Sequence, residues 1–329
     1  MKSMWRGWRR ALAPILACAL VGGCGGGSPV TTFTPSRVIA LGDEFSVIVD
    51  VNADANGRKY TVNALLSPTT DTTTLSCQGN PIWVQYLATA YHIVFPECNQ
   101  QPNAVANPTG RIRAQAGAHV ADISTQIDAQ VAESPFTGSD FVTILVGMHD
   151  ILDAYAQFPN VGEAELVTQL QAAGAALGAQ VNRVANTGAK VLISTVPDQG
   201  ITPFANAELA ANSDTNRAAL LQRLTQRFNA SLRSTIENDG RKIGLVLADE
   251  YFDNIITAGG GGFTNATTAV CDLSQSHEVP PSAFDCTVNT LIPGGNATSY
   301  LWADNFLLSA GGQTQLGQLA LSRAQNNPF

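Results

Sequence analysis

Four short, mainly apolar runs stand out along the chain, at residues 37–41, 141–146, 191–196 and 243–248. Apolar positions that are continuous rather than alternating are typical of strands covered on both faces, as in a parallel sheet. The pattern therefore predicts four buried strands that belong to one parallel sheet.

Between these runs, apolar residues recur at helical spacing. In 163–185 and 215–239 they form one stripe along each segment, and Gly188 and Gly240 lie at or beyond the ends. Weaker patterns predict helices over 115–131 and 309–322. Strands that alternate with helices predict an α/β protein, a three-layer α/β/α sandwich with a mostly parallel central sheet of the flavodoxin-like kind.

The first 23 residues form a basic start followed by a short apolar stretch, 11–21, which is too short to span a bilayer. Small residues then precede Cys24, as in bacterial lipoprotein signals whose cysteine becomes the lipidated N-terminus. We predict a lipoprotein signal peptide over 1–23, a lipidated N-terminus and flexible tether over 24–36, and one domain over 37–329. An ordinary secretory signal with an incidental cysteine is the alternative.

The residue after Cys24 is not Asp, which favours the outer membrane of the cell envelope over the inner. Without the four basic residues of the signal, 14 Lys and Arg face 26 Asp and Glu, a formal net charge of −12. No basic run follows the signal, so nucleic acid and anionic lipid surfaces are excluded as partners. The lipid is the one membrane contact that the sequence predicts.

Four cysteines remain in the mature chain, and four cysteines allow three pairings. We favour Cys77–Cys98 and Cys271–Cys286, because each pair closes a short local loop rich in Pro, Asn and Ser. Their spacing does not suit a Cys-x-x-Cys metal site, and an oxidising periplasm makes structural disulfides the simpler explanation.

Polar residues follow the predicted strands. Asp43 and Glu44 come after the first, His149 and Asp150 after the second, and further acids after the other two. In open parallel sheets, ligands bind at the carboxyl ends of the strands. Each acid alone is explained by helix or turn capping, but together they predict a cleft lined by Asp43, Glu44, His149 and Asp150.

Four blocks, taken in order, resemble those of the SGNH, or GDSL-type, serine hydrolase family of lipases and esterases. They are Gly42-Asp43-Glu44-Phe45-Ser46, Ala114-Gln115-Ala116-Gly117-Ala118, Gly147-Met148-His149-Asp150 and Asp304-Asn305-Phe306-Leu307. Each block is weak by itself, and their order and spacing carry the resemblance, which runs from about Arg37 to the end. The resemblance implies the sandwich fold predicted above and a site for ester hydrolysis.

The chain departs from the family at the residues that do the chemistry. Glu44 stands where the family has its nucleophilic serine, Leu307 where it has its histidine base, and His149 where it has an asparagine donor. Asp304 matches the family's acid, and Gly117 matches the glycine whose N–H binds the oxyanion. Acyl transfer needs the nucleophile, its base and the oxyanion donors together.

No other residue replaces the missing groups in the sequence. Ser46 lies two residues beyond the turn that should carry a nucleophile, and of the four histidines only His149 is expected near the site. The leading hypothesis is an envelope lipoprotein that has no cofactor and binds an acyl or acetylated-sugar ligand, or a partner, without catalysis.

Three alternatives stay open. The chain could be an active hydrolase of ester bonds in which Glu44 is a general base for water. It could hold Zn²⁺ or Mn²⁺ between Asp43, Glu44, His149 and Asp150. It could also be a structural envelope lipoprotein whose cleft has no ligand.

Overall fold

The computed structural model describes residues 33–50, 52 and 57–326. The compact unit begins at Phe33, whose ring packs edge-on against Phe141 with 6.2 Å between centroids. The predicted signal peptide, Cys24 and most of the predicted tether lie outside the described residues.

Five parallel strands form the central sheet. They are β1 (Arg37–Gly42), β4 (Arg111–Ile112), β5 (Asp140–Leu145), β6 (Lys190–Ser194) and β7 (Ile243–Val246). Their order across the sheet is β4-β1-β5-β6-β7. All four strands predicted from the apolar runs are present, and most of their residues are fully buried. β4 was not predicted, because two residues are too few to leave a pattern.

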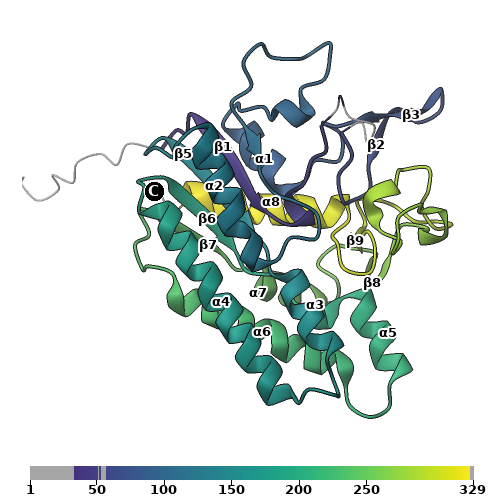
Figure 1. The fold of residues 1–329 in the computed structure, drawn as a ribbon. Coiled ribbons are helices and arrows are strands. Elements are labelled where there is room, and N and C mark those ends of the chain that lie inside the picture. The colour runs from purple at the N-terminus through teal and green to yellow at the C-terminus, as the bar shows by residue number, and fades with distance from the viewer. Residues whose placement is uncertain (1–32, 51, 53–56, 327–329) are drawn as a thin grey trace, which may run out of the picture. The chain divides into compact units, whose positions relative to one another are not determined.

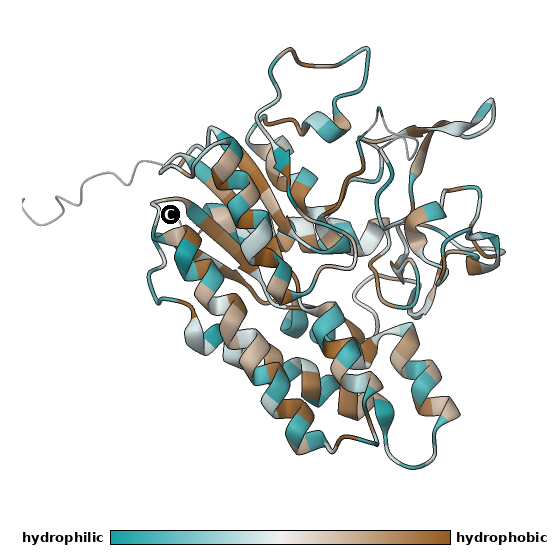
Figure 2. Cartoon of the chain, viewed as in Figure 1, coloured by the Kyte–Doolittle hydropathy of each residue, from teal (hydrophilic) through white to brown (hydrophobic). Residues whose placement is uncertain are grey.

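Helices cover both faces of this sheet (Figure 1). One layer contains α2 (Ile123–Glu133), α4 (Glu163–Ala185) and α6 (Arg217–Thr235); the other contains α1 (Trp83–Ala90) and α8 (Ala310–Asn326). The strands between them are the most apolar part of the drawing (Figure 2). The three-layer α/β/α prediction is therefore confirmed. Within the described residues, every helix is too short or too polar to cross a bilayer.

Several predicted bounds need correction. The helix expected over 215–239 spans only Arg217–Thr235, and the strand expected over 191–196 ends at Ser194. The helix expected over 115–131 begins only at Ile123, because Gly117 adopts a left-handed backbone (φ +74°) that an α-helix cannot contain. The strand expected to reach residue 248 ends at Val246, and α7 (Ala248–Thr257) starts there. The remaining elements are α3 (Met148–Ala156), α5 (Pro203–Ala211), β2 (Ala64–Ser67), β3 (Asp71–Ser76), β8 (Asn265–Ala269) and β9 (Tyr300–Trp302).

Both predicted disulfides are present. Cys77–Cys98 and Cys271–Cys286 join residues 21 and 15 positions apart, with Cα–Cα distances of 5.5 and 5.8 Å. The second bond lies in a small cluster of its own, where both cysteines pack with Val62 and Val270. The bond therefore closes a loop inside a long irregular segment, 270–299, and the packing on Val62 joins that segment to the body of the domain.

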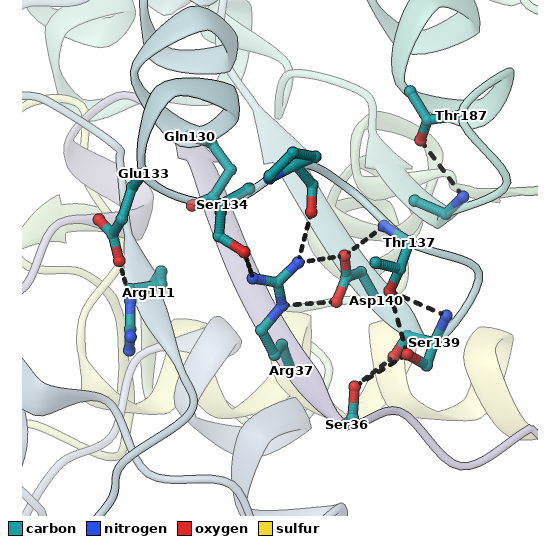
Figure 3. A network of polar contacts seen from close by, with 12 residues as sticks. Ser36, Arg37, Arg111, Gln130, Glu133, Ser134, Thr137, Ser139, Asp140 and Thr187 are labelled. Carbon is teal, nitrogen blue, oxygen red and sulfur yellow. Dashed lines mark hydrogen bonds and ion pairs between the residues drawn. The ribbon is translucent and has the colours of Figure 1, made fainter.

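A buried ion pair connects the amino ends of β1 and β5 (Figure 3). Arg37 donates from Nε and Nη2 to the two oxygens of Asp140, at 2.7 and 2.6 Å, and from Nη1 to Ser134 Oγ at 2.6 Å. Asp140 is fully buried. Two parallel bonds of this kind specify geometry as well as energy, so the pair holds the register of the two strands whose other ends carry the site.

Candidate functional site

The site lies where the strand order reverses. The chain goes from β1 to β4 on one side, then crosses back to β5 on the other side and continues to β6 and β7. In open parallel sheets, the crevice beyond the carboxyl ends at such a reversal is the usual ligand site. Glu44 lies two residues after the end of β1, and His149 lies in the first turn of α3 after β5, so both residues reach this crevice.

Two glycines allow the chain to turn sharply at these strand ends. Gly42 and Gly147 have φ values of +135° and +125°, which side-chain-bearing residues rarely adopt. A Cβ atom on Gly42 would lie 2.0 Å from the carbonyl oxygen of Leu145, and one on Gly147 would lie 2.4 Å from the Phe228 ring. Glycine at both places therefore permits the close approach that brings Glu44 and His149 together.

The Glu44 carboxylate contacts two other segments. Its Oε1 accepts a hydrogen bond from the Gly117 N–H at 2.6 Å, and His149 Nε2 lies 2.9 Å from both carboxylate oxygens. The Glu44 side chain is 10% exposed and that of His149 is 27% exposed. The hydrogen bond with Glu44 raises the pKa of His149, which favours an imidazolium–carboxylate pair. The three residues matched to separate family blocks are thus bonded to one another.

Asp43 and Asp150 lie beside this pair and cap backbone N–H groups. Asp43 is fully buried and accepts from the Phe45 N–H at 3.2 Å, while its Oδ2 has no hydrogen-bond partner. Burial, with the nearby charge of Glu44, raises the pKa of Asp43 well above its usual range. Asp150 accepts from the Val120 N–H at 3.0 Å, and burial raises its pKa as well. The site is therefore crowded with carboxyl groups for which ionisation is costly.

Asp304 is held by backbone groups. Its Oδ1 accepts from the N–H groups of Phe306 and Leu307 at 2.9 and 2.8 Å, and its Oδ2 accepts from that of Ala283 at 2.7 Å. Burial raises the pKa of Asp304. Leu307 is only 4% exposed and packs in the main core. The acid that the resemblance pairs with a histidine thus orders a loop, next to a leucine that fills core space.

A second histidine lies next to the pair. The ring of His119 is 5.6 Å from that of His149, centroid to centroid, and its Nε2 lies 2.8 Å from Asp153 Oδ2. The prediction that only His149 would be near the site is therefore wrong. His119 comes two residues after Gly117, so the same loop that brings the Gly117 N–H to Glu44 also brings this ring to α3.

A replacement nucleophile is not found at the site. Ser46 is fully buried and its Oγ accepts from Trp83 Nε1 at 3.1 Å. Across the described residues, no serine hydroxyl forms a hydrogen bond with a histidine ring. In the same part of the chain, no three His, Cys, Asp or Glu side chains are grouped so that they could hold a metal ion.

Two cavities are lined in part by residues of α3. One, of about 200 Å³, is lined by His119, Asp150 and Asp153 among others. The other, of about 400 Å³, is lined by residues from the second half of α3, from α5 and from the loop that contains Phe306. Both cavities share residues with α3, the helix that carries His149, but neither Glu44 nor His149 lines them.

No protein-family model and no curated protein matches this chain. Similar solved structures include a member of the lipolytic G-D-S-L family from Veillonella parvula, with 11% identity over 87% of this chain and 96% of the other and a TM-score of 0.42. Another is Axe2, an acetylxylan esterase from Geobacillus stearothermophilus, with 11% identity over 89% and 95% of the two chains and a TM-score of 0.44.

These are the kinds of protein that the four sequence blocks resemble. The five-stranded parallel sheet with helices on both faces establishes the fold class, and the contacts of Glu44, Gly117 and His149 define the site of this chain.

Proposed function

We propose that this chain is a non-catalytic binding protein of the bacterial envelope, built on a framework of the GDSL type and anchored to the outer membrane through Cys24. One observation carries the proposal. The Glu44 carboxylate accepts a hydrogen bond from the Gly117 N–H at 2.6 Å, and both of its oxygens lie 2.9 Å from His149 Nε2. The donors that would stabilise an oxyanion are thus already bonded to a side chain of the protein.

The electrostatics of the pair oppose acyl transfer. An oxyanion site works because its donors are aimed at a place where negative charge develops only in the transition state. Here a carboxylate lies at that place permanently, and Asp43 and Asp150 are close by. Acyl transfer also needs a base, and the side chain next to Asp304 is the buried Leu307. The arrangement suits holding a polar ligand better than breaking an ester bond.

The same contacts count against Glu44 as a general base. A general base must come within hydrogen-bond reach of the proton it takes, directly or through one water molecule. Both Glu44 oxygens already lie 2.9 Å from His149 Nε2, and only 10% of the side chain is exposed. Oε1 also accepts the Gly117 N–H, so a water molecule would have to reach the remaining lone pair of Oε2 on a mostly buried side chain.

Hydrolysis assays test the proposal. The purified protein, incubated with 4-nitrophenyl acetate and 4-nitrophenyl butyrate, is expected to release nitrophenol no faster than heat-denatured protein. The assay includes Glu44→Gln and, as a matched control, Glu163→Gln on the surface of α4. Turnover that survives in Glu163→Gln and disappears in Glu44→Gln would overturn the proposal and establish Glu44 as catalytic.

Lipid labelling tests the anchor. Cells that express the full chain, when fed an alkyne-tagged palmitate, are expected to label the protein and to retain it in the outer-membrane fraction. Cys24→Ser should abolish the label and release the protein to the soluble fraction. Label that persists in Cys24→Ser would contradict the proposed anchor. It would show that the lipid is attached to another residue or that the labelling is not specific to one residue.

A further inference from the structure

The 400 Å³ cavity combines aromatic rings with fixed polar groups. Its lining includes Leu152 and Tyr155 of α3, Phe204 of α5, and Phe306 and Arg217. Its volume lies within the range of small-molecule sites, roughly 300–1,000 Å³. None of the family blocks predicts it as a site, since only Phe306 belongs to one of them.

The aromatic walls come from separate segments that are joined to each other. The rings of Phe204 and Phe306 are 4.9 Å apart, and Tyr155 meets Phe204 edge-on at 5.9 Å. The Phe204 N–H also donates to the Asn305 carbonyl at 3.2 Å, which links α5 to the Phe306 loop. Phe204 and Phe306 are half-buried, so part of each ring faces the cavity side.

The polar groups of the lining are held in place by protein partners. Glu208 accepts from the Tyr155 hydroxyl at 2.6 Å and from Asn212 Nδ2 at 3.2 Å. The Arg217 guanidinium lies 4.6 Å from the centre of the Phe158 ring. Its Nε and Nη2 donate to the two oxygens of Asp214 at 3.0 and 2.6 Å. A ligand would therefore meet these groups already oriented, which lowers the entropy that binding costs.

The position of the cavity connects it with the Glu44–His149 pair. Leu152 and Ala156 follow His149 by three and seven residues, so all three lie on one face of α3. Seven residues correspond to about 10 Å along the helix axis. A ligand of two or more rings that fills the cavity could therefore extend along this face toward the pair.

We propose that this cavity binds neutral sugar rings of an oligosaccharide. This proposal rests on the proposed function in one respect, that the chain binds its ligand without cleaving it. A sugar ring has an apolar C–H face that stacks on aromatic rings and a rim of hydroxyl groups. That rim matches a carboxylate, an amide and a guanidinium, the polar groups of Glu208, Asn212 and Arg217.

Other ligand classes fit less well. Arg217 already covers the faces of Phe158 and Tyr155, at 4.6 and 5.9 Å, which leaves no aromatic cage for a ligand cation. Glu208 disfavours an anion in the same cavity. An alkyl chain would cover polar groups without replacing their contacts with water, which costs free energy for each group left unpaired.

Isothermal titration calorimetry tests the proposal. The probes are hexasaccharides of β-1,4-linked xylose, glucose and N-acetylglucosamine, with sodium dodecanoate as the acyl comparison. Binding of at least one hexasaccharide is expected, with an affinity that falls tenfold or more in Phe204→Ala and in Phe306→Ala. Tyr91→Ala, which truncates a half-buried ring packed against Phe141, is the matched control and should leave the affinity unchanged.

The proposal is overturned if none of the three hexasaccharides binds, if binding is the same in both phenylalanine variants, or if only dodecanoate binds. If an alanine variant fails to fold, Asn212→Ala replaces it, because within the described residues the hydrogen bonds of this half-buried side chain go to Glu208 alone. Sugar binding that depends on Phe306, together with ester turnover that depends on Glu44, would overturn the proposed lack of catalysis and leave the sugar site standing.

Discussion

Replacing Glu44 with alanine should destabilise the protein. Replacing a residue that a reaction requires often has the opposite result, because such residues contribute little to the stability of the fold or reduce it. The change removes the acceptor of the Gly117 N–H and the partner of His149. A hydrogen bond to a charged group contributes about 1.5–3 kcal/mol. His149 is 27% exposed and regains some contact with water, so we expect a loss of about 2–4 kcal/mol in the free energy of unfolding.

The loss should depend on pH with a definite sign. The bond to Glu44 raises the folded-state pKa of His149 above its ordinary 6.5. The stabilisation from a raised pKa is fully present below the unfolded value and is lost as the pH rises through the folded value. The difference between wild type and Glu44→Ala should therefore be larger at pH 6 than at pH 9.

Urea unfolding without reductant measures both effects, with the fluorescence of the buried Trp83 and Trp302 as the signal. Glu163→Ala is the matched control, because it removes a surface pair with Arg223 that should contribute less than about 1 kcal/mol. A Glu44→Ala variant as stable as the wild type would refute the interpretation that the contacts of Glu44 with Gly117 and His149 stabilise the fold. An equal loss at pH 6 and pH 9 would refute the charged pair.

Three further predictions concern stability. Burial lowers the pKa of Lys59 to about 7 from 10.5, so the unfolded chain binds more protons than the folded chain between these values. Urea unfolding should therefore show wild type gaining stability over Lys59→Met as the pH rises, by about 1.4 kcal/mol per pH unit between pH 8 and 9; a constant difference would contradict this. Replacing both Cys271 and Cys286 with serine should cost about 3 kcal/mol in the same assay without reductant, and thiol titration of the wild type should find none of the four mature cysteines free. Leu307→His should cost about 2–4 kcal/mol, because it buries an imidazole beside an acid whose oxygens already accept three N–H groups; a gain in nitrophenyl acetate turnover would count against this.

The sheet could be predicted because burial on both faces leaves a pattern that needs no long-range information. The runs at β1, β5, β6 and β7 are mainly apolar rather than alternating, and helices cover both of their faces (Figure 1). The carboxyl ends of these strands then placed Glu44 and His149 at one edge. Their direct contact could not be predicted, since it depends on the turn angles at Gly42 and Gly147.

The parts that escaped prediction depend on contacts between distant residues. His119 lies at the site because it pairs with Asp153, which is 34 positions away. The aromatic cavity is assembled from residues between 152 and 306, each of which has an ordinary apolar neighbourhood in the sequence. Gly117 looked like part of a helix because neighbouring alanines favour one, and only its left-handed backbone excludes it.

The ion pair between Arg37 and Asp140 affects which substitutions this fold can accept. It fixes β1 against β5 at the end remote from Glu44, and a slip of one residue there would move the opposite termini by about 3.3 Å. The distance between the ends of β1 and β5 in the crevice is thus set by an ion pair at the opposite end of the two strands. It does not depend on which side chains lie in the crevice. Substitutions there can alter the chemistry while the distances between positions persist, and this is the condition under which one scaffold can pass from cutting a ligand to holding it.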